Sequence, residues 1–148
     1  MAEPVPIECK LSIASEAAMD VPLLLGFELR NPGKHPLWVL DWNTPLEGLR
    51  NHYLSIKGPA GELDYHGPMV KRAAPLARQY RQLKPGERLY GEVDLKLAYQ
   101  FVQPGSYEVA FTGRLHDVQH GKHPRPDKVE RQPQEPACAP VRFKLLPR

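Results

Sequence analysis

Ile7-Glu8-Cys9-Lys10-Leu11-Ser12-Ile13 is the stretch of sequence that decides the fold class. Its apolar side chains fall on the odd positions and its polar side chains on the even ones. This period of two is typical of a β-strand with one face in a core and the other in water. The same alternation recurs in Leu23–Leu29, and Asn31-Pro-Gly33 follows it as a turn.

Further strand-like segments follow at short intervals along the chain. They are Pro36–Trp42, Tyr53–Lys57, Glu62–His66, Leu89–Leu95, Tyr107–Leu115 and a final segment at 141–146. Gly58-Pro-Ala-Gly61 predicts a hairpin between the second and third of these segments. The 17 prolines, about twice the usual share, interrupt helices throughout the chain.

These signals predict an all-β fold, specifically an immunoglobulin-like antiparallel β-sandwich of about 7–9 strands. We expect only short helical turns in the connections, namely one or two turns between Leu95 and Val102. Residues 14–20 have helical propensity but are too short for a stable helix, and we expect a loop there. Pro104-Gly-Ser-Tyr107 places a tyrosine just after a corner, where its hydroxyl can bond to upstream backbone or the ring can simply fill the core.

A chain of 148 residues fits one domain, spanning 1–148. Its core is expected at about 7–115, completed by the final strand at 141–146. Residues 116–140 form a long polar connection, and loops of this length in a compact domain are usually functional or mobile. We therefore expect high mobility in residues 116–140.

The net charge of +3 is distributed unevenly along the chain. Residues 1–113 carry 12 basic and 13 acidic residues, whereas residues 114–148 carry 8 basic and 4 acidic ones. The basic segment contains a single aromatic residue, Phe143, so we expect no nucleic-acid partner. The longest apolar run, Val21–Leu25, is too short to span a membrane. With no secretory signal visible, the default compartment is the cytoplasm, or the periplasm or exterior if a signal has been removed.

Two cysteines, Cys9 and Cys138, lie beside the predicted first and last strands. Those strands can be neighbours in a sandwich, so a disulfide is geometrically possible. Two unpaired thiols in a reducing compartment are the interpretation that we favour from the sequence.

The histidine-rich stretch His116-Asp-Val-Gln-His120, with His123 beyond it, has the histidine spacing of zinc peptidases. Its context does not suit that chemistry, because a strand precedes it and Gly121 and Pro124 end any helix at once. A site for zinc or copper formed by His116, His120 and His123 is the alternative, and a solvated loop is the simplest interpretation. No resident cofactor is expected otherwise.

The best candidate recognition element follows the third strand, in Trp42, Asn43, Thr44, Pro45 and Leu46. One of Trp38 and Trp42 is expected in the core, and Trp42 lies at the end of the strand, where partial exposure is possible. Exposed Trp and Leu side chains on a loop mark an interaction surface, although the same residues could close the end of the sandwich. Lys71 and Arg72 form a basic pair that could contact an anionic group on a partner.

No nucleophile elbow, phosphate-binding loop or dinucleotide-binding motif occurs in the chain. We therefore expect no catalytic residue and a module that binds rather than catalyses. A carbohydrate- or peptide-binding sandwich that uses Trp42, Tyr53 and Tyr65 is a further alternative.

Seven short motifs occur in an order that resembles a known domain. They are Leu29-Arg-Asn-Pro-Gly33, Val39-Leu-Asp-Trp-Asn-Thr-Pro-Leu-Glu-Gly48, Gly67-Pro-Met-Val-Lys-Arg72, Leu83-Lys-Pro-Gly-Glu87, Val93-Asp-Leu95 with Ala98-Tyr99, Pro104-Gly-Ser-Tyr107 and Phe111-Thr-Gly113. The series resembles the non-catalytic amino-terminal domain of deuterolysin-like (aspzincin, M35) metallopeptidases of the lysine-specific type. It covers roughly residues 7–115.

The resemblance implies a prodomain-like module that assists the folding of a metallopeptidase or holds one inactive. The catalytic domain of that family carries His-Glu-x-x-His and a downstream Gly-Thr-x-x-Asp, and this chain has neither motif. No catalytic residue therefore carries over. The partner that the resemblance implies is a protein, and most concretely a metallopeptidase.

Overall fold

Three antiparallel strands with alternating burial form the first sheet of the structure, a computed structural model that describes residues 5–127 and 130–148. They are β1 (Glu8–Ser12), β3 (Leu24–Arg30) and β8 (Arg88–Asp94), in the order β1-β3-β8. Leu25, Phe27 and Leu29 of β3 are fully buried on one face. The alternation of the sequence therefore places the first sheet with one face in the core and one in water.

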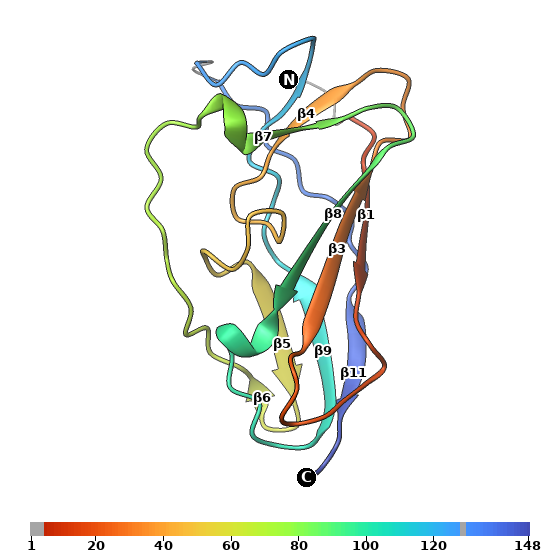
Figure 1. Cartoon of the computed structure of the whole chain (residues 1–148), viewed down its shortest axis with the longest axis vertical. Coiled ribbons are helices and arrows are strands. Elements are labelled where there is room, and N and C mark those ends of the chain that lie inside the picture. Colours follow the sequence, from red (N-terminus) through yellow and green to blue (C-terminus); the bar gives the residue numbers. More distant parts are fainter. Residues whose placement is uncertain (1–4, 128–129) are drawn as a thin grey trace.

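A second sheet of five strands faces the first. Its order is β2 (Glu16–Ala17), β11 (Val141–Leu145), β9 (Gly105–Phe111), β5 (Leu54–Gly58) and β6 (Gly61–Glu62). β2 pairs with β11 in parallel and the other neighbours pair antiparallel. Figure 1 shows the β1-β3-β8 sheet in front of the strands of this second sheet.

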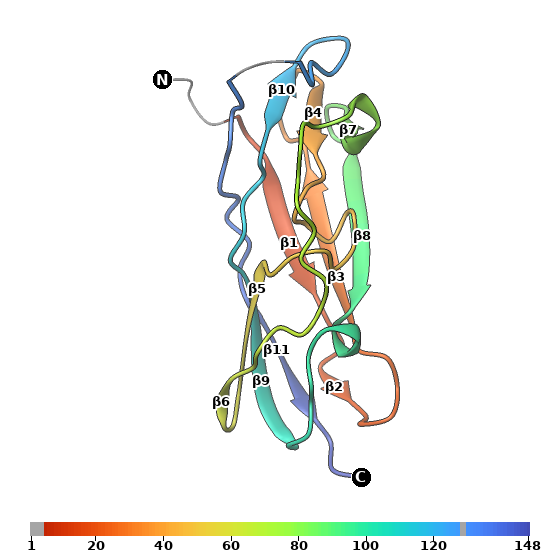
Figure 2. The ribbon, with the colours of Figure 1, turned by 90° about the vertical axis from the view of Figure 1, so that its left-hand side faces the viewer.

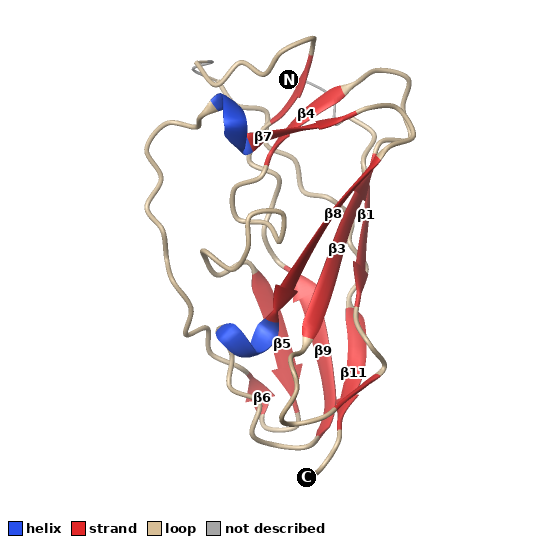
Figure 3. Cartoon of the chain, viewed as in Figure 1, coloured by secondary structure: helices blue, strands red, loops and turns tan. Residues whose placement is uncertain are grey.

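Apolar side chains from both sheets form one continuous core. The rings of Phe27 on β3 and Phe111 on β9 lie 5.3 Å apart between the sheets. On the second sheet, Tyr107 stacks on its neighbour across the strands, Phe143, at 5.2 Å. The predicted all-β sandwich is thus confirmed, and Figure 3 shows how little helix it contains. The immunoglobulin-like assignment stays a prediction.

A third, small sheet closes the end of the molecule opposite the carboxyl terminus (Figure 1). It contains β10 (Val118–His120), β4 (Leu37–Leu40) and β7 (Tyr80–Leu83), all antiparallel. Leu40, Trp42 and Tyr80 form a separate buried cluster beside this sheet, and Trp38 packs against it.

The strand predictions from alternation are confirmed, whereas strands with other patterns were missed. The described residues contain eleven strands rather than about 7–9. The predicted loop at 14–20 contains β2, and neither β7 nor β10 was predicted. The predicted helical turn is present as the 3₁₀ helix η2 (Leu95–Leu97), and a second one, η1 (Ala77–Gln79), precedes β7.

The predicted tyrosine corner is present at the start of β9. The hydroxyl of Tyr107 donates to the backbone carbonyl of Gln103, four residues upstream. Burial raises the pKa of the Tyr107 hydroxyl. The ring also packs in the core, so this residue serves both of the roles that the sequence allowed.

The long polar connection at 116–140, of which residues 128–129 lie outside the described part, contains some paired backbone, while its expected mobility stays a prediction. Val118–His120 pair with β4, and Leu115 and Gln134 exchange backbone hydrogen bonds of 2.8 and 2.9 Å. Figure 2 shows this segment running along the molecule beside the β-sheets. Polar composition predicted a loop here because Asp117 and Gln119 interrupt the apolar pattern.

The preference for two free thiols is also wrong. Cys9 and Cys138 form a disulfide across a sequence separation of 129, with their Cα atoms 4.8 Å apart. The two residues pair as neighbours between β1 and the segment that leads into β11. The sequence allowed this pairing through the proximity of the first and last strands.

Within the described residues no helix is long and apolar enough to cross a membrane.

Candidate functional site

The 41–48 loop, which follows β4, is buried instead of exposed. Trp42 is only 5 % exposed, Thr44 is fully buried and Pro45 is buried. Leu46 is half-buried and packs against the main core. Of the two interpretations that the sequence left open, the structure therefore favours the buried one, and Trp42 is not an exposed anchor.

Hydrogen bonds within the 41–48 loop fix its conformation. The Thr44 hydroxyl donates to the Asp41 carbonyl at 2.9 Å and accepts from the Leu46 amide at 3.2 Å. Asn43 adopts a left-handed backbone conformation, with φ of 55°. Its backbone N–H donates to the Glu47 carboxylate at 2.6 Å. Asparagine tolerates this backbone region better than most residues, which explains its place in the turn.

Arginines from distant segments hold the 41–48 loop in place. Arg72 forms an ion pair with Glu47, and both side chains are largely buried. Its guanidinium carbon lies 5.2 Å from the centre of the Trp42 ring, and that of Arg131 lies 5.4 Å from it. Cation–π contacts of this kind stabilise a buried ring by about 1–2 kcal/mol. Lys71 is exposed, so of the predicted basic pair only Lys71 faces solvent fully.

A polar depression of about 380 Å³ opens beside this loop. Its wall carries four guanidinium groups and two carboxylates, from Arg50, Arg72, Arg78, Arg81, Asp41 and Glu47. We call it the arginine pocket. Burial raises the pKa of the Asp41 carboxyl, and the neighbouring Arg81 guanidinium opposes that rise.

Sequence reasoning missed Arg50, Arg78 and Arg81. Arg81 lies on β7 and pairs with Asp41 at 3.2 Å across a sequence distance of 40 residues. A pair of residues so far apart in sequence leaves no local motif from which such a site could be predicted. The one signal in the sequence was the run of arginines at 72, 78 and 81.

A second depression, of about 360 Å³, is lined mainly by apolar groups. Leu49, Pro68, Val93, Leu97 and Ala98 line it. We call it the apolar pocket. Among its lining residues Leu97 is 77 % exposed, so an apolar side chain faces solvent at this pocket. Such exposure on a small protein is typical of a contact surface.

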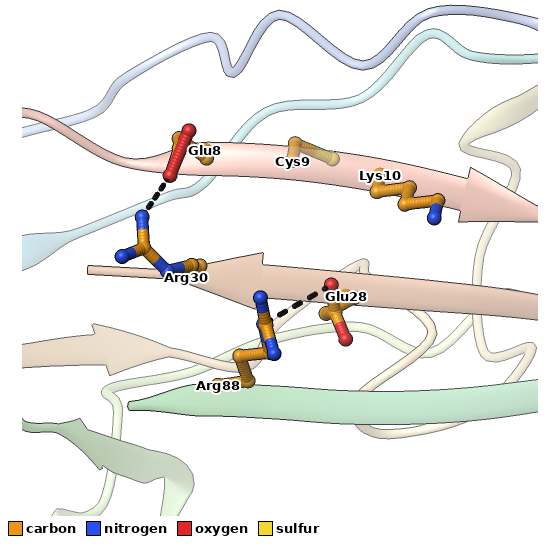
Figure 4. A pocket seen from close by; sticks show the side chains of 6 residues that line it. All are labelled: Glu8, Cys9, Lys10, Glu28, Arg30 and Arg88. Carbon is orange, nitrogen blue, oxygen red and sulfur yellow. Dashed lines mark hydrogen bonds and ion pairs between the residues drawn. The ribbon is translucent and has the colours of Figure 1, made fainter. Parts of the chain in front are cut away.

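The outer face of the β1-β3-β8 sheet has a shallow polar depression of about 460 Å³. Figure 4 shows Arg30 pointing at Glu8 and Arg88 pointing at Glu28, each from a neighbouring strand. The Arg88–Glu28 distance is 3.7 Å. These exposed pairs neutralise one another and contribute about 0–1 kcal/mol each, so we interpret this face as solvated.

The predicted histidine site for zinc or copper is not assembled. Within residues 5–127 and 130–148, no three His, Cys, Asp or Glu side chains lie close enough to hold a metal ion. His116 contacts Asn43, whereas the exposed His120 lies near His35, with 6.4 Å between the ring centres. His123 is exposed. The strand pairing of Val118–His120 separates the three imidazoles.

The aromatic platform of the carbohydrate- or peptide-binding alternative is not formed either. Tyr53 is 2 % exposed and donates its hydroxyl to the Gly48 carbonyl at 2.9 Å. Burial raises the pKa of the Tyr53 hydroxyl. Tyr65 is half-buried and stacks on His52 at 5.5 Å. With Trp42 and Tyr53 inside, the three rings do not share a surface.

Replacing His116 by glutamine should weaken the acid sensitivity of the fold. The Asn51 side chain donates to the side-chain oxygen (Oδ1) of Asn43 at 2.7 Å, so the side-chain nitrogen (Nδ2) of Asn43 faces the His116 Nε2 atom at 3.2 Å. The His116 Nε2 atom must therefore accept a hydrogen bond from Asn43, which requires that this nitrogen carries no proton. Burial, and then the nearby arginines, lower the pKa of His116. The unfolded chain binds the proton first, so stability is lost as pH falls below about 6.5.

Urea unfolding between about pH 7.5 and pH 5.5 measures this effect. The wild type should lose more stability over that range than His116→Gln. The exposed His123→Gln is the matched control and should follow the wild type. An identical pH dependence of the wild type and His116→Gln would contradict the hydrogen bond as the cause.

Comparison with known proteins links the chain to a protease. No family model matches it. An extracellular protease of Aeromonas hydrophila is 27 % identical to this chain over 106 residues, which amount to 71 % of the chain and 30 % of the protease. The chain thus spans less than a third of that relative's length. The similarity supports a peptidase-related domain.

Proposed function

We propose that the chain is a non-catalytic, prodomain-like module that binds a metallopeptidase and holds it inactive or assists its folding. The observation that carries this proposal is the match of 106 residues to part of an extracellular protease. The ordered motifs that resemble the amino-terminal domain of M35 metallopeptidases support it independently. In this proposal the chain has no catalytic residue of its own.

The structure offers a suitable contact surface at the apolar pocket. Leu97 is exposed there, and Leu49 and Pro68 also line the pocket. Protein interfaces are centred on apolar groups of this kind and surrounded by polar ones. Glu92 and Asp94 at the margin supply the polar rim. This surface takes the place of the buried Trp42 as the proposed anchor.

We further propose an oxidising compartment, outside the cell or in the periplasm, in place of the cytoplasmic default. The Cys9–Cys138 disulfide supports this location, because structural disulfides persist mainly in secreted proteins. The description of the similar protease as extracellular agrees with it.

The test is a pull-down and inhibition assay with a purified M35-type metallopeptidase catalytic domain. The module should retain the peptidase and inhibit peptide hydrolysis in proportion to its concentration. Leu97→Asp should lower the affinity at least tenfold, because it places a charge in the apolar contact. Val102→Asp is the matched control, since Val102 is 81 % exposed and does not line the apolar pocket.

Retention by wild type and Val102→Asp, but not by Leu97→Asp, is the expected result. A wild-type module that neither binds the peptidase nor alters its activity or its refolding yield would remove the proposal. Equal loss in both variants would instead remove the apolar pocket as the contact surface.

A further inference from the structure

The arginine pocket carries more positive charge than its own carboxylates neutralise. Glu47 pairs with Arg72, and Asp41 pairs with Arg81. Arg50 and Arg78 take part in no ion pair among the residues that the structure describes. Two guanidinium groups therefore remain to attract an anion into a depression of about 380 Å³.

Hydrogen bonds hold the Arg81 and Arg50 side chains against the 41–48 loop. Arg81 donates through Nε to Asp41 at 3.2 Å and through Nη2 to the Leu46 carbonyl at 3.3 Å. Arg50 donates through Nε to the Glu47 carbonyl at 3.2 Å. The segment that carries Arg78 and Arg81 is tied to the loop by the bond from the Asp41 amide to the Gln79 carbonyl. A site that is ordered in advance loses less entropy when it binds a ligand.

The wall of the arginine pocket also holds buried polar atoms without partners. Asp41 Oδ1 and Arg72 Nε are both buried, and neither finds a hydrogen-bond partner within the described residues. Buried polar groups are normally satisfied, so each such atom needs an explanation. Both atoms have almost no accessible surface, so a ligand in the depression would contact the exposed guanidinium groups rather than this pair.

We propose that the arginine pocket binds the carboxylate of an acidic peptide segment on the protein partner. This inference rests on the proposed function and specifies the chemistry of its contact. Guanidinium groups bind carboxylates through two parallel hydrogen bonds, which gives direction as well as attraction. A nucleic-acid strand would need exposed aromatic rings along a basic track, and Trp42 beside the arginine pocket is buried.

The probe is a fluorescein-labelled peptide, Gly-Glu-Gly-Asp-Gly-Glu-Gly, and its matched amide form, Gly-Gln-Gly-Asn-Gly-Gln-Gly. Fluorescence anisotropy with the full chain should show that the acidic peptide binds at least tenfold more tightly than the amide form. The double variant Arg50→Ala/Arg78→Ala should lower this affinity at least tenfold. Both side chains are exposed, so the variant should keep the fold, which circular dichroism verifies.

The matched control is Arg88→Ala/Arg142→Ala, which removes the same charge from exposed positions outside the arginine pocket. Its affinity should stay within twofold of the wild type. Equal loss in the control, or equal binding of the amide peptide, would overturn the proposal. Inorganic phosphate that competes at lower concentration than the acidic peptide would also overturn it, in favour of a general anion site.

The same double variant separates this inference from the proposed function in the peptidase pull-down. Loss of retention by Arg50→Ala/Arg78→Ala supports a carboxylate contact on the peptidase. Undiminished retention by this variant would overturn the inference while the proposed function stands. Binding of the acidic peptide without any binding of the peptidase would overturn the proposed function, while the carboxylate site in the arginine pocket would stand.

Discussion

Replacing Cys9 and Cys138 together by serine should lower the free energy of unfolding by about 5 kcal/mol. The disulfide joins residues separated by 129 positions, and in the chain-entropy model a loop of this size restricts the unfolded chain strongly. Marginal stability of about 5–15 kcal/mol is usual for a domain, so such a loss would leave a substantial unfolded fraction. Urea unfolding of the oxidised wild type and the double serine variant measures the difference.

Reduction provides the matched control for this prediction. Dithiothreitol should destabilise the wild type and leave the double serine variant unchanged. Limited proteolysis should also cut the segment before Cys138 faster once the bridge is open, because the disulfide ties that segment to β1. A loss below about 1 kcal/mol would show that packing alone positions the chain ends.

Strands with strict alternation were predictable from the sequence because each buries one face. Residues 7–13 and 23–29 predicted β1 and β3, and the structure places both in the first sheet. Tyr107 was predictable as a corner residue because its bond to Gln103 is local. In each case the pattern that identifies the structure lies within a few residues of sequence.

Strands that depend on distant partners were not predictable. β10 contains the buried Gln119, which bonds to Asp117 and to the Arg125 backbone, so a polar residue stands where alternation expects an apolar one. β2 has two residues and exists through its parallel pairing with β11. The disulfide likewise depends on which strands are neighbours in space.

The burial of the candidate recognition element was not predictable from the sequence. The sequence singled out the segment from Trp42 to Leu46 as a candidate, yet it could not decide between an exposed loop and a buried one. The outcome depends on Arg72 and Arg131, which approach the Trp42 ring from distant parts of the chain. The side chains of Arg50, Arg78 and Arg81 line one depression, and their proximity depends on the pairing of β4 with β7.

Replacing Asp117 by alanine should lower the free energy of unfolding by about 4 kcal/mol, because it leaves several buried donors unpaired. Asp117 is fully buried, and its carboxylate accepts from the Tyr80 hydroxyl, the Gln119 amide and the Gln132 backbone at 2.7, 2.7 and 2.9 Å. Burial, followed by the bond to Asp117, raises the pKa of the Tyr80 hydroxyl. Urea unfolding followed by tryptophan fluorescence measures the loss, since Trp42 and Tyr80 share one cluster.

Asp127→Ala is the matched control, because its side chain is 74 % exposed and its pair with Arg125 is long at 3.4 Å. Its stability should stay within about 0.5 kcal/mol of the wild type. Asp117→Asn should fall between, since an amide oxygen keeps some of the acceptors. A loss below about 1 kcal/mol for Asp117→Ala would contradict the network as the support of the third sheet. The same contacts give Asp117 of the histidine-rich motif a structural role, because three donors already bond to its carboxylate.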